Sequence, residues 1–284
     1  MQATRGAAFS EAALGRQRGI MGILNVTPDS FSDGGRFFEI GAAIERGYLL
    51  ADMGADIIDV GGESSRPGAA PVPVEEELRR VIPVIAELSK SFRVSVDTYK
   101  AEVAARAVEA GATLINDISA TLAEVAASYG VGWVAMHMQG SPQSMQKNPR
   151  YTDVAKEVYE YLSQKIAWAR ELGVPEVWID PGIGFGKDFT HNLALLSRLD
   201  SLSQLGAPML VGTSRKAFLG RIAKASKGIE VPPIERTEAS VASCAWCFTH
   251  GATMMRVHDV AETRELLTLL SWYPEQLEKE SRDG

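Results

Sequence analysis

Polar and charged residues stand at the ends of short apolar runs in this chain, where a folded protein could use them to bind a substrate. The run Val177-Trp178-Ile179 ends in Asp180, and a segment with three glycines follows it. That pattern is typical of a buried parallel strand leading into a loop with unusual backbone angles. A buried carboxylate is costly without a partner, so we interpret Asp180 as a ligand-binding residue. Similar runs supply further carboxylates, amides and cations: Asn25, Glu63, Arg66, Asp97, Asn116, Asp117, His137, Thr213, Arg256 and His258.

One part of this set has the chemistry of a site for a flat heterocycle. Asp97, Asn116 and Asp180 offer carboxylate and amide groups. A carboxylate pairs well with a ring N–H and an adjacent amino group. Lys216, which follows the seventh apolar run, could reach an acceptor atom on the same ring.

A second part has the chemistry of a phosphate or diphosphate site. Arg256 and His258 alternate along the eighth run, so they point the same way. Closure of a barrel would bring Asn25 beside them, and a hard cation could join the site. Any one of these residues could instead cap a helix or support a neighbour. A shared ligand site explains their common position at the ends of the apolar runs better than a separate structural role for every residue.

Motifs of several other enzyme classes do not fit. The segment 182–187 has the wrong spacing for a Walker phosphate loop, and Asp188 stands where that loop needs Ser or Thr. Ser64 and Ser65 have no His and Asp placed as triad partners. Lys216 as a Schiff-base lysine stays open as an alternative.

Eight apolar runs alternate with segments of helical period, and this alternation predicts the fold. The expected strands are Ile20–Asn25, Asp56–Val60, Arg93–Asp97, Thr113–Asp117, Gly132–His137, Val177–Asp180, Pro208–Thr213 and Thr253–His258. Glycine ends most of the helical segments, as is common. The expected helices are Ile40–Gly54, Val74–Ser89, Lys100–Ala110, Thr121–Tyr129, Thr152–Leu172, His191–Leu205, Glu235–His250 and Val260–Tyr273.

Strand and helix alternating eight times predict an α/β fold, a single-domain (β/α)₈ TIM barrel with its site at the C-terminal ends of the strands. A doubly wound open sheet is the alternative. The first run, however, is followed by residues 25–30, which are no dinucleotide-binding fingerprint. We expect the barrel to span residues 20–273, with a loose N-terminal tail over 1–19 and a polar C-terminal tail over 274–284.

Composition excludes several kinds of partner. The net charge of −7 over 284 residues argues against binding to nucleic acid or an anionic membrane. No apolar run approaches the length of a membrane span, and the first 19 residues lack the apolar segment of a secretory signal. Cys244 and Cys247 fall in a helical pattern, and we interpret them as small apolar residues rather than a redox or zinc motif. These features predict a cytoplasmic protein.

In their order and spacing, the motifs resemble those of the dihydropteroate synthase family of folate biosynthesis. The matching segments are residues 22–35, 61–68, 95–98, 115–118, 136–140, 180–187, 214–216 and 256–258, and they span most of the chain. Two features depart from the family pattern. Ser65 stands where the family commonly has Thr, and the segment after Ser119 is shortened.

The resemblance implies a (β/α)₈ barrel, usually a homodimer, that joins 6-hydroxymethyl-7,8-dihydropterin diphosphate to p-aminobenzoate and releases diphosphate. It also implies a dissociative reaction. Diphosphate leaves first, and the amine of p-aminobenzoate attacks the resulting cation, so no protein nucleophile is needed.

The resemblance also implies roles for individual residues by matching position. The pterin would be held or lined by Asp97, Asn116, Met136, Asp180, Phe185, Gly212 and Lys216. Asn25 would help to bind Mg²⁺ and diphosphate, with Arg256 and His258 on the same leaving group. Asp33, Ser65 and Arg66 would lie on mobile first and second loops that close over p-aminobenzoate. The residues expected to act in catalysis are then Asn25, Asp33, Arg66, Lys216, Arg256 and His258.

Two other functions would use part of this set. A methyl-tetrahydrofolate-dependent methyltransferase would need the pterin-binding residues but not the diphosphate group. A non-catalytic pterin-binding paralogue would be expected to have gaps in the first two loops, and the sequence has none. Because sulfonamides mimic p-aminobenzoate, we expect a sulfonamide-sensitive enzyme, with an insensitive variant as the alternative.

Overall fold

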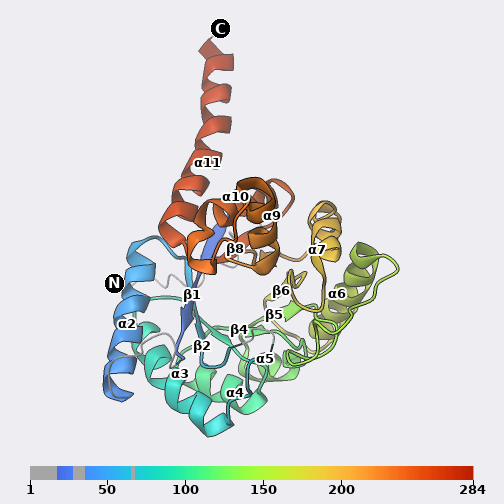
Figure 1. Cartoon of the computed structure of the whole chain (residues 1–284). Helices are drawn as coiled ribbons and strands as arrows, with labels where there is room; N and C mark the ends of the chain where they lie inside the picture. The colour runs from blue at the N-terminus through green and yellow to red at the C-terminus, as the bar shows by residue number, and fades with distance from the viewer. Residues whose placement is uncertain (1–17, 28–35, 65–67, 284) are drawn as a thin grey trace.

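The computed structural model describes residues 18–27, 36–64 and 68–283, over which parallel strands form a ring surrounded by helices (Figure 1). The strands are β1 (Gly19–Asn25), β2 (Ile57–Gly61), β3 (Val94–Asp97), β4 (Leu114–Asp117), β5 (Gly132–Met136), β6 (Val177–Asp180), β7 (Leu210–Val211) and β8 (Met254–Val257). Each lies within one or two residues of an apolar run that predicted it, because such runs can be buried on both faces.

The strands close into a barrel. β1 pairs in parallel with β2 on one side and with β8 on the other. The pairing order runs β6-β5-β4-β3-β2-β1-β8-β7, and a parallel bridge between Ile179 and Met209 joins the two ends. This closure confirms the predicted (β/α)₈ barrel and excludes the open doubly wound sheet.

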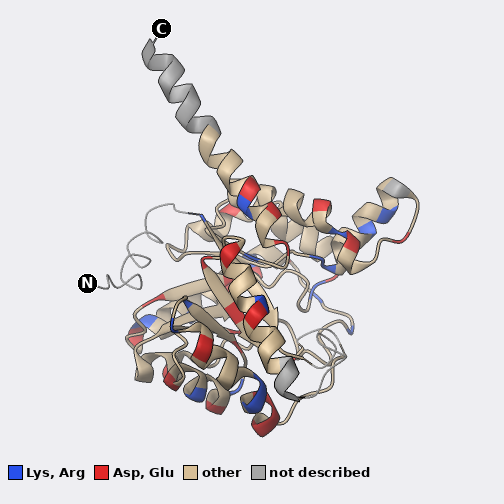
Figure 2. Cartoon of the chain, turned by 90° about the vertical axis from the view of Figure 1, so that its left-hand side faces the viewer, with Lys and Arg blue, Asp and Glu red and all other residues tan. Residues whose placement is uncertain are grey.

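Helices cover the outside of the ring. They are α2 (Arg36–Asp52), α3 (Val74–Leu88), α4 (Ala101–Glu109), α5 (Ala123–Tyr129), α6 (Val154–Glu171), α7 (Phe189–Leu196), α8 (Asp200–Ser203), α9 (Ala217–Lys227), α10 (Thr237–Thr249) and α11 (Val260–Asp283), with a 3₁₀ turn η2 (Pro233–Glu235). Figure 2 shows acidic and basic residues interspersed on the outer helices. No helix in the described part of the chain is long and apolar enough to cross a membrane.

The helices differ from the sequence expectation in three places. The expected helix His191–Leu205 is two helices, α7 and α8. The sequence analysis missed α9, although Gly228 follows it in the left-handed conformation that commonly ends a helix. Helix α11 continues past Tyr273 to Asp283, so almost all of the segment expected as a polar tail is helical (Figure 1).

The barrel interior has an apolar layer near the N-terminal ends of the strands. Its members form one buried cluster: Met21, Ile57, Leu114, Val134, Trp178, Leu210 and Met254. Side chains alternate between the two faces of a strand, so the residues two positions further along also point inward. This layer therefore forms the floor beneath a site at the C-terminal ends.

Strand register fixes which polar residues lie above this floor. Three of them, Asn25, Asp97 and Asn116, point the same way, because they and Gly61 are successive Cα partners across β1 to β4. The residues one position earlier point to the helices and are buried there: Leu24, Val60, Val96 and Ile115.

Candidate active site

A network of two carboxylates, an amide and an arginine lies inside the barrel. Oδ2 of Asp59 accepts hydrogen bonds from Nε of Arg256 at 2.6 Å and from Nδ2 of Asn116 at 3.0 Å. Nη2 of Arg256 donates to Oδ2 of Asp97 at 2.6 Å. Two donor atoms of Arg256 are thus held by carboxylates, which fixes the guanidinium group.

Asp59 is a site residue that the sequence analysis missed. It is fully buried, and its other oxygen, Oδ1, has no hydrogen-bond partner in the described structure. The signal was available, because one carboxylate interrupts the apolar run Ile57–Val60. A charge within a buried strand needs a partner, but the sequence analysis considered only the ends of the runs.

Asp97 and Arg256 affect each other's protonation. Burial raises the pKa of Asp97 to about 7, although the positive charge of Arg256 opposes this shift. Burial alone would lower the pKa of Arg256, but the charges of Asp59 and Asp97 outweigh it and raise that pKa. Arg256 therefore stays cationic, while Asp97 can gain or lose a proton near neutral pH.

Asp180 ends β6 and is fixed by the loop that follows it. Its Oδ1 accepts a hydrogen bond from the amide of Gly182 at 2.6 Å, and its side chain is buried. Burial raises its pKa, while the charge of Lys216 acts in the opposite direction. Met136 is the strand partner of Asp180 and is also buried, so the structure brings these two predicted residues together.

Lys216 lies between the loop after β6 and the arginine network. Its Nζ donates to the carbonyl of Ile183 and lies 4.6 Å from the ring centroid of Phe185. A Cβ added at Gly212 would lie 3.9 Å from this Nζ and 3.8 Å from Cβ of Arg256. Burial lowers the pKa of Lys216 to about 8, and Asp180 opposes the shift. The predicted residues Phe185, Gly212 and Lys216 therefore lie together.

The loop that carries Lys216 is braced from two sides. Arg215 has a left-handed backbone with φ of 60° and forms an ion pair with Asp259. Arg236 is buried and donates to the carbonyl of Arg215 at 3.0 Å. Ser214 hydrogen-bonds Nδ1 of His258 at 3.0 Å, which places this predicted residue beside the same loop.

Four residues of the expected polar ring instead support the backbone or neighbouring side chains. Glu63 binds Lys100 and Tyr99, and Thr213 bonds Ser243. His137 bonds Lys187. Asp117 accepts from the amides of Thr121 and Leu122 at 2.7 Å each, and from Nε1 of Trp133 at 3.1 Å. Asp117 follows Asn116 directly, so it points to the opposite face of β4.

We expect Asp117→Ala to lower the free energy of unfolding by about 3 kcal/mol, because it leaves several buried donors unpaired. Equilibrium denaturant unfolding measures this loss. Asp153→Ala, which removes a helix cap at an exposed site of α6, is the matched control and should cost much less. If the stability of Asp117→Ala were unchanged and its pterin affinity were lost, Asp117 would instead be assigned to the binding site.

Asn25 offers one amide oxygen to a hard cation that arrives with a substrate. It ends β1 and is half-buried. Its strand partner is Gly61 of β2, which in turn is the strand partner of Asp97 of β3. In the described ranges, no group of three or more His, Cys, Asp or Glu could hold a metal ion. Mg²⁺ commonly binds through one or two protein oxygens, water and substrate phosphates, so an amide oxygen here fits a Mg²⁺ that arrives with diphosphate. Asp33, Ser65 and Arg66 lie outside the described residues.

Known proteins share both the sequence and the barrel of this chain. The model of the family described as "Pterin binding enzyme" matches residues 21–258. The dihydropteroate synthase of Escherichia coli (strain K12) is 45% identical over 259 residues, which cover 88% of this chain and 90% of that protein.

Two solved structures are similarly close. The dihydropteroate synthase of Xanthomonas albilineans with 4-aminobenzoic acid is 45% identical with a TM-score of 0.83, covering 93% of this chain and 94% of that one. Its complex with 7,8-dihydropteroate is 44% identical with a TM-score of 0.80, covering 93% and 95%. The family match and these identities show that the chain belongs to the dihydropteroate synthases, a group of pterin-binding enzymes.

Proposed function

We propose that this chain is a transferase that condenses 6-hydroxymethyl-7,8-dihydropterin diphosphate with p-aminobenzoate, giving 7,8-dihydropteroate and diphosphate. The observation that carries the proposal is the convergence of Asp97, Asn116, Asp180 and Lys216 at one end of the barrel, beside Arg256. The relative solved with 4-aminobenzoic acid and with 7,8-dihydropteroate supports the same substrates.

The pterin lies, in this proposal, between the loop after β6 and the Asp59–Arg256 network. Asp180 accepts hydrogen bonds from ring N–H and amino groups, because a fixed carboxylate suits two adjacent donors. Asp97 and Asn116 contact the opposite edge of the ring. Lys216 donates to a ring acceptor, and its position over Phe185 keeps a slot open beside Gly212.

The diphosphate lies near the ends of β1 and β8. Nη1 of Arg256 and the ring of His258 would contact the leaving group, and Asn25 would hold Mg²⁺ beside it. When bound, this ion would neutralise charge that develops on the diphosphate. Arg256 remains cationic at neutral pH because two carboxylates flank it, so its charge is present when the bond breaks.

The reaction breaks one carbon–oxygen bond and forms one carbon–nitrogen bond. The pterin methylene carbon loses diphosphate with the bonding electron pair, and the ring stabilises the cation. The amine of p-aminobenzoate then donates its lone pair to that carbon and loses a proton. Fixed groups that stabilise the separated charges lower the barrier. Asp33, Ser65 and Arg66 are proposed to close over p-aminobenzoate and keep water out.

Purified protein, both substrates and Mg²⁺ test the reaction directly. We expect diphosphate release that depends on p-aminobenzoate and yields dihydropteroate, with a sulfonamide competing against p-aminobenzoate. Pterin binding without product would favour the non-catalytic paralogue. Calorimetric binding of methyl-tetrahydrofolate, with no affinity for diphosphate, would favour the methyltransferase.

We also propose that the enzyme acts as a homodimer in the cytoplasm. The family resemblance motivates the dimer, and the composition motivates the compartment. Light scattering during gel filtration measures the assembly, and a mass of one chain at micromolar concentration would contradict the dimer. Fractionation of producing cells tests the compartment.

A further inference from the structure

Lys187 is a buried lysine at the end of the glycine-rich loop of residues 182–186, and the proposed reaction does not use it. Its side chain is 2% exposed. Nζ lies 2.9 Å from Nδ1 of His137 and 3.0 Å from the carbonyl oxygens of Gly182 and Phe185. An ammonium group has three N–H donors, and these three acceptors can take all of them. Lysine is seldom buried unless it is paired, and these hydrogen bonds offset the cost of burying Lys187.

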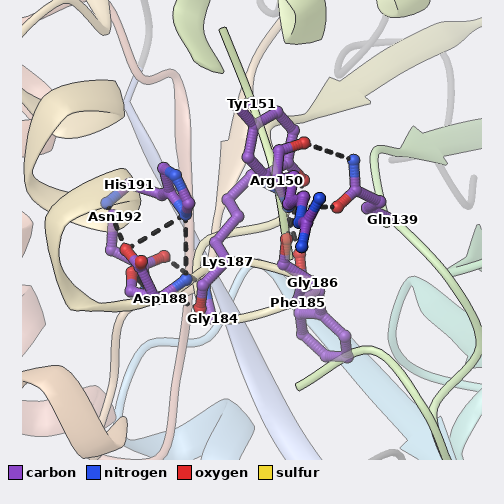
Figure 3. Close-up of polar contacts among 10 residues, drawn as sticks. All are labelled: Gln139, Arg150, Tyr151, Gly184, Phe185, Gly186, Lys187, Asp188, His191 and Asn192. Atoms are coloured by element: carbon purple, nitrogen blue, oxygen red, sulfur yellow. Dashed lines mark hydrogen bonds and ion pairs between the residues drawn. The ribbon is translucent and has the colours of Figure 1, made fainter. Parts of the chain in front are cut away.

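The partners of Lys187 belong to a loop whose shape is fixed by side chains. Each carbonyl from residue 182 to residue 186 accepts a hydrogen bond from a side chain. Lys187 binds the first and the fourth. The carbonyls between and after them bind Lys216, Gln146 at 2.8 Å and Tyr151 at 2.7 Å. Figure 3 shows Lys187 and Tyr151 with the loop residues Gly184 to Gly186.

The glycines let this loop lie directly on the end of β5. Gly182 and Gly186 have φ of 65° and 58°. A Cβ at Gly182 would lie 1.8 Å from the carbonyl oxygen of His137, and one at Gly186 would lie 2.4 Å from that of Gln139. Left-handed angles and close backbone contact both require glycine. Lys187 binds the loop and His137 together, so it joins the two sides of this contact.

The same loop also contacts and positions the side chain of Lys216. The carbonyl of Ile183 accepts from Nζ of Lys216, and the ring of Phe185 lies beneath that Nζ. Ile183 lies between the two carbonyls that Lys187 holds. Loss of the hydrogen bonds that Lys187 donates to the loop would therefore move the Ile183 carbonyl and the Phe185 ring, the two groups that position Lys216.

We propose that Lys187 is a positioning residue of the pterin site, and that the hydrogen bonds of its buried Nζ fix the 182–186 loop in the shape that holds Lys216 and Phe185 in place. The inference rests on the proposed function, because it assigns Lys187 to the pterin half of the same site. Lys187 acts through the loop and does not touch the substrate. Its loss should therefore weaken binding of the pterin substrate.

Steady-state kinetics of Lys187→Met and Lys187→Gln test the proposal. Methionine keeps the length and apolar stem but removes every donor, whereas glutamine keeps two N–H donors without the charge. We expect KM for the pterin diphosphate to rise about tenfold or more in Lys187→Met and by a smaller factor in Lys187→Gln. KM for p-aminobenzoate is measured in parallel.

Lys156→Met makes the same replacement at an exposed position of α6 and should leave both KM values unchanged. A purely structural role for Lys187 would lower the melting temperature without changing KM for the pterin. That result in Lys187→Met would overturn the proposal. If Lys187→Met does not fold, Lys187→Gln decides, and a pterin KM within about twofold of wild type would overturn it.

Failure of the inference can be told apart from failure of the proposed function. Wild-type protein that makes no dihydropteroate contradicts the function itself. Wild-type turnover together with an unchanged pterin KM in the Lys187 variants contradicts only the role of Lys187. Calorimetric titration with the pterin diphosphate, without p-aminobenzoate, provides the same comparison for binding alone.

Discussion

Asp180→Asn is expected to weaken binding of the pterin substrate by about a hundredfold. The variant side chain has one acceptor oxygen fewer, so a donor of the bound substrate would be buried without a hydrogen-bond partner. The amide keeps the shape of the carboxylate but has one acceptor oxygen and adds an NH₂ group. In one orientation the NH₂ group would face a donor of the ring, and in the other it would face the amide of Gly182, which now donates to Oδ1 at 2.6 Å. Isothermal titration with the pterin diphosphate measures the loss.

Asp200→Asn is the matched control, since Asp200 is exposed on α8. The control should bind the pterin like the wild type. Affinity for p-aminobenzoate analogues in Asp180→Asn should change much less than affinity for the pterin. Near-normal pterin affinity in this variant would mean that the pterin lies elsewhere in the barrel.

Arg256→Leu is expected to cost about 3–5 kcal/mol of folding stability and to abolish turnover, because it leaves two buried carboxylates without their shared cation. Asp59 loses a partner at 2.6 Å, and so does Asp97. The variant also removes the charge that faces the leaving group in the proposed mechanism. Denaturant unfolding and diphosphate release measure the two effects separately.

A double-mutant cycle with Asp59→Asn isolates the cause of the stability loss. Arg256→Leu combined with Asp59→Asn removes one of the two unpaired charges, so it should recover part of the stability but none of the turnover. Arg256→Lys keeps a cation and should retain more stability than Arg256→Leu. Strict additivity of the two single substitutions would contradict the coupling between Asp59 and Arg256.

The fold was readable from the sequence because its signals are local. Apolar runs that can be buried on both faces indicate parallel strands, and glycines after helical segments indicate their ends. The missed helix α9 and the division into α7 and α8 both fall between β6 and β8. A four-residue helix such as α8 has too few turns for its period to be recognised.

Two adjacent residues of β4 show that the sequence analysis did not establish which polar residues face the barrel interior. Asn116 and Asp117 are both polar and both end β4, and only strand geometry decides that one faces the barrel interior and the other the helices. The sequence analysis placed both in the ring. The register with β3 and β5, which depends on closure of the whole sheet, settles that Asn116 is the inward residue.

The sequence by itself predicted the barrel and a candidate site at the C-terminal ends of its strands, because strand period, glycine positions and strand-end polarity lie within short segments. The order of its motifs carried the resemblance to the family. Only the tertiary structure decided which side chains are partners. Asp59 and Arg256 are 197 residues apart in the chain and meet because β1 joins β2 to β8. Lys187 reads as a loop residue in the sequence. Its burial against His137, 50 residues away, follows from the packing of one loop on a neighbouring strand.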